Sequence, residues 1–414
     1  MGFIKKYKNV LAGLLINTVE HHSTVLYGYY ASLMAPIFFP ADDPKLNEMR
    51  ALGVFALTFV MQPVAGFILG RIGDLYGRKL SMIVGVLSIA IPTLLIGILP
   101  GYETLGIIAP ILLIFALMIQ SAGGAAAYSG TAVFLNEFGS SKVQSLLSAL
   151  LSASGFIGAI IASFCGALYD SNSEWRLSFI GGGILGLLLM RLRSQLEETP
   201  VFKKSLREKG LHPSKSFLEV IKSRKRNFIC AIGIAGGCNL PFYLICIYFN
   251  SLLVVDLGVP HPSMLKYNMG LLAFWGLFLP LVGHISDKVG IKRLMMVSAL
   301  GLVFLSIPFF AWTLEDLTLT KIHLLRGLLS IFAMGILAPG TAYIMPLFEV
   351  QERQTGSSVA YAVGAVLFGG TAPFICRLLV DQTGHPIAPA YYLAFCGLMT
   401  AASIWYAKPV EEEE

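Results

Sequence analysis

A stripe of polar residues crosses an otherwise apolar stretch near the N-terminus. Glu20 and His21 fall in the middle of a run rich in Val, Leu and Ile. Positions three, four and seven residues apart share one face of a helix, so the stripe consists of Asn17, Glu20, His21, Thr24 and Gly28. Placing an ionisable group at bilayer depth costs at least about 2.5 kcal/mol by insertion scales. We therefore interpret Glu20 as a proton carrier, and Asn17, His21 and Thr24 as substrate contacts.

The two adjacent histidines are expected to differ. An imidazole titrates near neutral pH and can donate a hydrogen bond to a carboxylate. His21 lies on the polar stripe, so it is a candidate for both substrate binding and proton transfer. His22 points about 100° away from it. We expect His22 to pack against a neighbouring helix, with proton transfer as the alternative.

Other polar residues interrupt apolar stretches further along the chain. Asn239 and Tyr243 flank Pro241, and a proline within a helix frees backbone carbonyls that polar ligands can use. Taken alone, each such residue is more typical of packing than of binding. Arg377 allows two interpretations, pairing with a substrate carboxylate or turning outward to Asp381. The remaining substrate-binding candidates are Gln120, Asn239, Tyr243, Tyr361 and Arg377.

A short charged loop between two apolar runs reads Gly-Arg-Ile-Gly-Asp-Leu-Tyr-Gly-Arg-Lys over residues 70–79. Its glycines allow two helix ends to approach closely, and its basic residues favour the cytoplasmic side. A related segment returns at 283–293. We expect a charge cluster that closes the cytoplasmic side, with Asp74 near the N-terminal end of a helix beginning around residue 356, where the helix dipole favours an anion. The gating candidates are Gly70, Asp74, Gly77, Arg78, Lys79, Glu137 and Asp287.

Composition indicates the class of protein that carries these groups. Hydrophobic residues make up 56% of the 414 residues, charged residues 13%, and the mean hydropathy is +0.73; an average soluble domain is about 25% charged. A helix needs about 20 apolar residues to cross a bilayer, and the short alternating strands of a barrel are absent. We predict an all-α membrane protein with twelve transmembrane helices. The predicted spans are 9–38, 50–72, 80–99, 105–136, 145–169, 176–193, 227–253, 265–286, 293–312, 321–347, 356–380 and 387–407.

One long polar segment, 194–226, divides these spans six and six. We predict a bundle over 1–193, a cytoplasmic linker, and a second bundle over 227–414. Lys and Arg concentrate in alternate loops and in the segment 191–226, which predicts that both termini are cytoplasmic. The net charge of +6 is thus a topology signal, and no nucleic-acid partner is expected. The six cysteines have no metal-ligand spacing, and neither a metal nor a cofactor is expected.

Several of these segments resemble a known family. The loop 70–79 resembles the loop between spans two and three of the major facilitator superfamily. Within that superfamily the chain is similar to the metabolite:proton symporters. Its matching segments are Asn17-Thr-Val-Glu20, Tyr27-Gly28, Phe38-Phe39-Pro40, the stretch from Leu99 to Pro110, Trp175-Arg-Leu-Ser-Phe179, Glu198-Thr-Pro-Val-Phe202 and Leu367-Phe-Gly-Gly-Thr-Ala-Pro373. The resemblance implies two six-helix bundles facing each other across a central cavity, and import of osmolytes such as proline and betaine, or of carboxylates, with a proton.

The chain departs from that family at charged positions. The family's Glu-Trp-Tyr-Asp in the first span is Glu-His-His-Ser here, over residues 20–23. A fourth-span Arg is replaced by Leu117, the Gly-Gly-Glu that follows is an Ala/Gly run at 123–127, and the Asn after Tyr361 is Ala362. The resemblance therefore implies the fold, whereas the substrate and the proton route do not carry over.

The predicted function is import of a small polar metabolite by proton symport with alternating access. The histidines and Arg377 favour an organic acid, a zwitterion or a carboxylate-rich metal chelate as substrate. We expect a monomer in the lipid bilayer of a bacterial cytoplasmic (inner) membrane. The alternatives are a proton-driven drug or metabolite exporter, an uncoupled facilitator, and a membrane sensor. No nucleophile–base pair or phosphate loop favours an enzyme.

Overall fold

The computed structural model describes residues 3–40, 50, 53–54, 57–138, 141–168, 175–194, 198–199, 202–204, 206, 219, 224–349 and 352–410. Within these residues the secondary structure is helical throughout, without a strand. Most of the expected linker 194–226 lies outside the described residues, as do residues 51–52 and 55–56 of the second predicted span.

The helices of the first half follow the predicted spans closely. They are α1 (Phe3–Phe38), α3 (Gln62–Tyr76), α4 (Arg78–Ile98), α5 (Tyr102–Leu105), α6 (Ile108–Phe138), η1 (Ser141–Val143), α7 (Gln144–Leu168) and α8 (Trp175–Ser194). Two boundaries differ by several residues from the prediction. Helix α1 begins before its apolar stretch, and α3 continues through Asp74 to Tyr76 before Gly77 ends it.

The second half repeats this pattern with two interrupted helices. Its elements are α11 (Lys225–Tyr243), η2 (Leu244–Tyr248), α12 (Phe249–Val255), α13 (His261–Val289), α14 (Ile291–Leu314), α15 (Leu319–Ile344), η3 (Met345–Leu347), α16 (Arg353–Gly364), η4 (Ala365–Gly370), α17 (Ala372–Thr383) and α18 (Ala388–Tyr406). By length and hydropathy, eight helical stretches of the described chain could each cross a membrane. Helix α3, with 15 described residues, is too short to count among them.

Two of the long helices contain π-helical segments where the cavity described below lies. In one, η2 directly follows α11, whose last turn contains Pro241. In the other, η4 separates α16 from α17 and ends at Gly370, three residues before Pro373. Proline removes a backbone donor and disturbs the regular ladder, and π-helical turns are frequent at functional sites.

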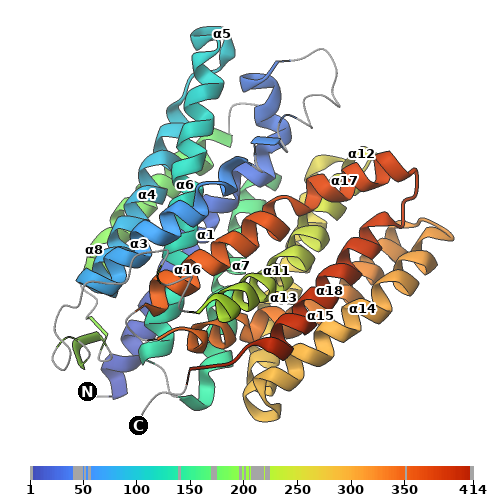
Figure 1. The fold of residues 1–414 in the computed structure, drawn as a ribbon. Coiled ribbons are helices and arrows are strands. Elements are labelled where there is room, and N and C mark those ends of the chain that lie inside the picture. The colour runs from blue at the N-terminus through green and yellow to red at the C-terminus, as the bar shows by residue number, and fades with distance from the viewer. Residues whose placement is uncertain are drawn as a thin grey trace.

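The start of α1 and the end of the described chain after α18 lie at the same end of the helical bundle, which we call the terminal side (Figure 1). Within the first half, α4 packs on α6 and α8, and α1 packs on α7. Within the second half, α14 packs on α15 and α18, and α11 on α16 and α18. The halves meet mainly where α7 runs along α13 and where α3 runs along α16.

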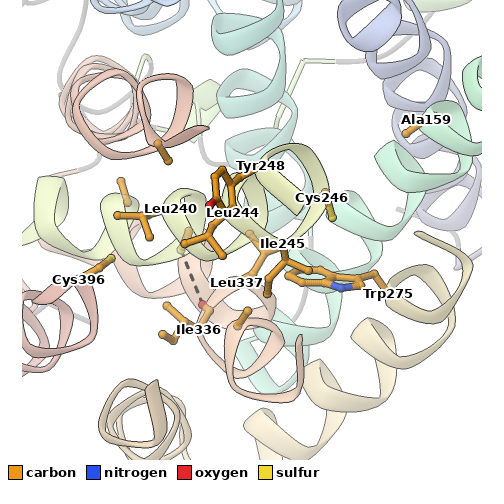
Figure 2. Packing of buried hydrophobic residues seen from close by; sticks show 14 of the residues in the cluster. Ala159, Leu240, Leu244, Ile245, Cys246, Tyr248, Trp275, Ile336, Leu337 and Cys396 are labelled. Atoms are coloured by element: carbon orange, nitrogen blue, oxygen red, sulfur yellow. Dashed lines mark hydrogen bonds between the residues drawn. The ribbon is translucent and has the colours of Figure 1, made fainter. Parts of the chain in front are cut away.

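Aromatic rings fill the seam between the halves. Phe156 of α7 stacks on Phe242 of α11 at 5.4 Å between ring centroids and meets Trp275 of α13 edge-on at 5.6 Å. The indole nitrogen of Trp275 donates to Ser330 Oγ at 2.7 Å, so this buried ring keeps its hydrogen bond. Figure 2 shows Trp275 beside Ile245 and other buried residues of the second half. This packing forms a wall on one side of the central cavity.

Candidate substrate cavity and gate

A cavity of about 130 Å³ lies between the two halves. Its lining comes from seven helices of both halves (α1, α3, α6, α7, α11, α15 and α16), from the short helical stretch at 57–59 and from η4. The lining residues are Asn17, Glu20, His21, Thr24, Phe59, Gln62, Gly124, Tyr128, Ser152, Gly155, Phe156, Cys238, Asn239, Phe242, Tyr243, Leu337, Tyr361 and Ala365. A second cavity of about 70 Å³ adjoins it and shares His21, Thr24, Phe59, Gln62, Phe242 and Tyr243. A ligand here would touch both halves at once, as alternating access requires.

The predicted stripe on α1 faces this cavity. Asn17 is held by its side-chain amide, which donates to the Leu151 carbonyl and to Ser154 Oγ, both at 2.9 Å. His21 lies over Gly155, where a Cβ atom would come within 3.1 Å of the imidazole. Its Nε2 is buried without a hydrogen-bond partner among the described residues. The structure therefore leaves this ring nitrogen of the stripe available to a ligand, as it does Glu20 Oε2, which also has no partner among the described residues.

Glu20 carries an ion pair that the sequence analysis missed. Arg193 Nη1 pairs with Glu20 Oε1, and Arg193 Nη2 donates to Thr131 Oγ1 at 2.7 Å. Arg193 is fully buried, although in the sequence it stands where the predicted bundle 1–193 meets the basic segment 191–226. The sequence does not reveal this burial, because it depends on which side of the last turn of α8 faces the bundle: Arg193 faces inward, whereas Arg191 and Ser194 are exposed. One signal in the sequence could have indicated this ion pair: a carboxylate buried in the membrane, such as Glu20, needs a counter-charge.

The remaining predicted contacts divide between the two cavities. Gln120 lines the smaller one, and its amide donates to Thr93 Oγ1 at 2.7 Å and to the Ser23 carbonyl at 3.1 Å. Asn239 and Tyr361 line the larger cavity, while Tyr243 lines both. The sequence thus located these residues correctly, and their role in binding stays a prediction.

Two predicted residues lie elsewhere. Arg377 is one-third exposed and forms an ion pair with Asp256 at 2.8 Å and a longer one with Asp381 at 3.5 Å. It lines neither cavity, and its ion pair with Asp381 agrees with the outward interpretation rather than with pairing to a substrate carboxylate. His22 packs against Gly182 of α8, where a Cβ atom would come within 3.2 Å of its ring. That position agrees with the expected packing role.

Most of the aromatic lining was missed. Phe59, Phe156 and Phe242 look like ordinary core residues in an apolar stretch, and nothing in their spacing distinguishes them from lipid-facing phenylalanines. In the structure Phe59 meets Tyr243 edge-on at 5.6 Å, and the Tyr128 and Tyr361 rings lie 5.6 Å apart. Each pair joins one residue from each half, so the cavity has an aromatic wall that spans the seam.

On the terminal side, the structure brings Asp74, Arg78 and Glu137 together. Arg78 Nη1 lies 2.7 Å from Asp74 Oδ1, and its Nη2 lies 3.2 Å from Glu137 Oε1. The three side chains are almost completely buried. Arg78 Nη1 also donates to the Gly73 carbonyl at 2.7 Å, which fixes the turn between α3 and α4.

Residues beyond α8 brace this cluster and were not predicted as part of it. Glu198 accepts hydrogen bonds from the backbone amides of Arg78 and Lys79 at 3.1 and 3.2 Å. Thr199 Oγ1 donates to Glu137 Oε2 at 2.6 Å. Gly77 has φ +104°, and any Cβ there would collide with the Glu198 carboxylate. Gly77 is therefore required by both backbone conformation and space.

Asp74 also joins the two halves. Its Oδ2 accepts from the Thr355 amide at 2.9 Å and from Thr355 Oγ1 at 2.6 Å, in the first turn of α16. A carboxylate there satisfies an orphan amide and complements the helix dipole. Gly70 permits the approach, since a Cβ would lie 2.8 Å from Thr355 Cα. The expected position of Asp74 at this helix end is correct.

The second copy of the loop makes the reciprocal contact. Asp287, at the end of α13, accepts from the amides of Ser145 and Leu146 at 2.9 and 3.0 Å, at the start of α7. A Cβ at Gly283 would lie 2.6 Å from Ala149 Cβ. Each half therefore places one aspartate on a helix N-terminus of the other half, on the terminal side.

Comparison with known proteins agrees with this geometry. A model of the Major Facilitator Superfamily matches residues 23–322. The glycine betaine/proline/ectoine/pipecolic acid transporter OusA of Dickeya dadantii is 29% identical over 95% of this chain and 82% of its own length. The proline/betaine transporter of Escherichia coli K12 is 28% identical over 97% of this chain and 83% of its own.

Solved structures share the fold. The proton:xylose symporter XylE superposes with a TM-score of 0.76 at 14% identity, covering 98% of this chain and 96% of XylE. The human organic anion transporter MFSD10 gives 0.69 at 13% identity, over 96% and 99% of the two chains. The predicted twelve-helix fold is thus confirmed, and the protein is a transporter of small metabolites rather than an enzyme. The family model covers well over half of the chain, which therefore belongs to the Major Facilitator Superfamily.

Proposed function

We propose that this protein imports a small zwitterion of the betaine or proline type by proton symport. The observation that carries the proposal is the central cavity, in which a neutral polar face on α1 opposes an aromatic wall from both halves. The names of the relatives OusA and the Escherichia coli transporter include betaine and proline, and these compounds are the first to test.

The aromatic wall suits the cationic end of such a substrate. An alkylated ammonium group binds favourably over the faces of Tyr, Trp and Phe rings, with a gain of about 0.5–2 kcal/mol. Tyr243 and Phe59 lie on one part of the wall, and Tyr128 and Tyr361 on another. The methyl or ring carbons of the substrate would remain in apolar surroundings.

The polar face suits the carboxylate end. His21 Nε2 has no partner among the described residues and lines both cavities, so in the appropriate tautomer it can donate to a substrate carboxylate. The Glu20–Arg193 pair has no net charge, and Arg377 lies outside. Of the three substrate classes expected from the sequence, a zwitterion therefore matches the charge of the cavity better than an organic acid or a metal chelate.

Coupling to protons follows from the same ion pair. A proton on Glu20 removes its negative charge and leaves Arg193 uncompensated beside the cavity. The resulting positive charge favours the carboxylate of the substrate, so proton and substrate promote each other's binding by the same factor. Glu20 Oε2 is buried without a partner among the described residues and is the proposed site of protonation.

Alternating access would proceed by opening of the terminal side. We place that side in the cytoplasm because the helix ends there carry the basic residues Arg71, Lys79, Lys292 and Arg293. Asp74 and Asp287 hold the halves together there, which corresponds to a transporter closed to the cytoplasm. Opening requires both aspartates to leave the helix ends of the opposite half.

Uptake into proteoliposomes tests this function. We expect radiolabelled glycine betaine or proline to accumulate when an inward proton gradient is imposed, and a protonophore to abolish accumulation. Glu20→Gln should lose accumulation and retain counterflow exchange, whereas Arg377→Gln serves as a charged control outside the cavity. Preference for citrate or succinate would overturn the zwitterion, and uptake indifferent to the gradient would overturn the symport.

A further inference from the structure

A third cavity, of about 390 Å³, lies between α13 and α15 in the second half. It shares no lining residue with the two central cavities. Its lining consists of Lys266, Tyr267, Gly270, Leu271, Phe274, His323, Arg326 and Gly327. Two of these eight residues, Lys266 and Arg326, carry positive charges, His323 adds an imidazole, and none of the eight is acidic. The cavity lining therefore has positive charge without a counter-charge of its own.

Arg326 is the unusual group. Its side chain is 1% exposed, and its Nη2 donates to Asn250 Oδ1 at 2.9 Å. Its Nε and Nη1 have no hydrogen-bond partner within the described residues. Burying a guanidinium against a neutral amide leaves a charge uncompensated and two donors unused, which is costly unless an anion completes the site.

Its neighbours add to the same site. His323 has a buried Nε2 that also lacks a partner among the described residues, and its ring lies 4.9 Å from that of Tyr267. Lys266 is exposed at the rim. Gly270 and Gly327 keep the space open, because a Cβ at either position would meet no described heavy atom within 4 Å.

The distance of the basic residues from the starts of their helices indicates which part of the bilayer surrounds the cavity. Lys266, His323 and Arg326 are five, four and seven residues from the starts of α13 and α15, roughly 6–11 Å along the helices. Both starts lie away from the terminal side (Figure 1). That depth corresponds to the boundary between lipid headgroups and hydrocarbon.

From these contacts we propose that the cavity between α13 and α15 binds a phosphate group. The planar fork of an arginine can donate two hydrogen bonds to one phosphate, and a lysine at the rim adds a point charge. A phosphate offers more acceptor oxygens than a carboxylate and so fits three donors. The phosphodiester of an anionic lipid and a soluble phosphate share this chemistry.

Binding to the purified full-length protein distinguishes the two sources. Native mass spectrometry would measure retention of phosphatidylglycerol against phosphatidylcholine, and thermal unfolding would measure stabilisation by inorganic phosphate. Retention of phosphatidylglycerol alone assigns the site to a lipid, and stabilisation by phosphate identifies a soluble ligand. Absence of both effects would overturn the proposal.

Variants connect the binding to this cavity. Lys266→Gln and Gly327→Leu remove a charge and fill the space at positions where the fold has room, and Arg326→Gln removes the buried cation. Losing one charge-assisted hydrogen bond should weaken binding about tenfold or more. Lys321→Gln, a basic residue of α15 that does not line the cavity, is the matched control. Equal binding by all four variants and the parent would overturn the proposal.

Discussion

At the scale of single residues, the two adjacent histidines provide a sharp comparison. His21 faces both central cavities, whereas His22 packs on Gly182. We expect His21→Ala to weaken substrate binding about tenfold, the value of one lost hydrogen bond to a charged group. His22→Ala should leave affinity unchanged and lower the unfolding temperature. Calorimetric titration and thermal unfolding of both variants measure these effects, and equal affinities would show that the α1 stripe does not bind substrate.

The Glu20–Arg193 pair leads to a second prediction at this scale. Glu20→Gln leaves the fully buried Arg193 without a counter-charge, and breaking a buried pair in this way costs about 3–5 kcal/mol. The double variant Glu20→Gln/Arg193→Gln removes both charges and should recover most of that loss. Thermal unfolding of the single and double variants measures the loss and the recovery of stability. A double variant as unstable as the single one would mean that the charges do not compensate each other.

At the scale of the helices, glycines decide how closely the halves approach. At Gly70 an added methyl would lie 2.8 Å from Thr355 Cα, on the backbone of α16. Overpacking of this kind costs about 1–3 kcal/mol. Because the clash occurs only while the terminal side is closed, Gly70→Ala should favour the open state by roughly tenfold or more.

To measure that opening, a cysteine is introduced at Ser152 in the central cavity, and Cys238 of the same cavity is replaced by Ser. An alkylating reagent added from the terminal side then labels this cysteine faster when that side is open. Gly181→Ala is the control, since its Cβ would meet no described atom within 4 Å. Unchanged labelling in Gly70→Ala would contradict a closure that depends on this contact.

At the scale of the whole molecule, Asp74 and Asp287 form two contacts between the halves that are related by the internal repeat. Asp74→Asn removes the charge but keeps a side chain of the same shape, so the contact at residue 74 weakens while the contact at Asp287 remains. We expect each single variant to open the terminal side partially and slow transport, with the binding constant little changed. The double variant Asp74→Asn/Asp287→Asn should open it far more.

Spin labels at Tyr76 and Arg293, exposed residues on opposite halves of that side, measure the opening as a longer interspin distance. The native cysteines are buried apart from the half-buried Cys165, so the introduced labels should dominate the signal. If the double variant keeps the parent distance, these aspartates do not hold the halves together.

The sequence by itself determined the class, the helices and the repeat. Apolar runs of spanning length have one solution in a bilayer, the helix, because each backbone group must find its partner within the segment. The contacts of the charged segments around Asp74 and Asp287 can also be predicted from the sequence, because local geometry restricts the residue types there. Closely packed helix ends need glycine, and a helix N-terminus attracts a carboxylate.

Only the tertiary structure decided which polar and aromatic side chains meet. Arg193 and Arg377 look alike in sequence, each near the end of an apolar stretch. Arg193 lies inside the bundle and forms an ion pair with Glu20, whereas Arg377 lies outside and forms an ion pair with Asp256. Helix rotation and depth make that difference, and both are set by packing against helices remote in the chain. For the same reason the aromatic wall and the basic cavity between α13 and α15 could not be found from spacing, since each joins residues of different helices.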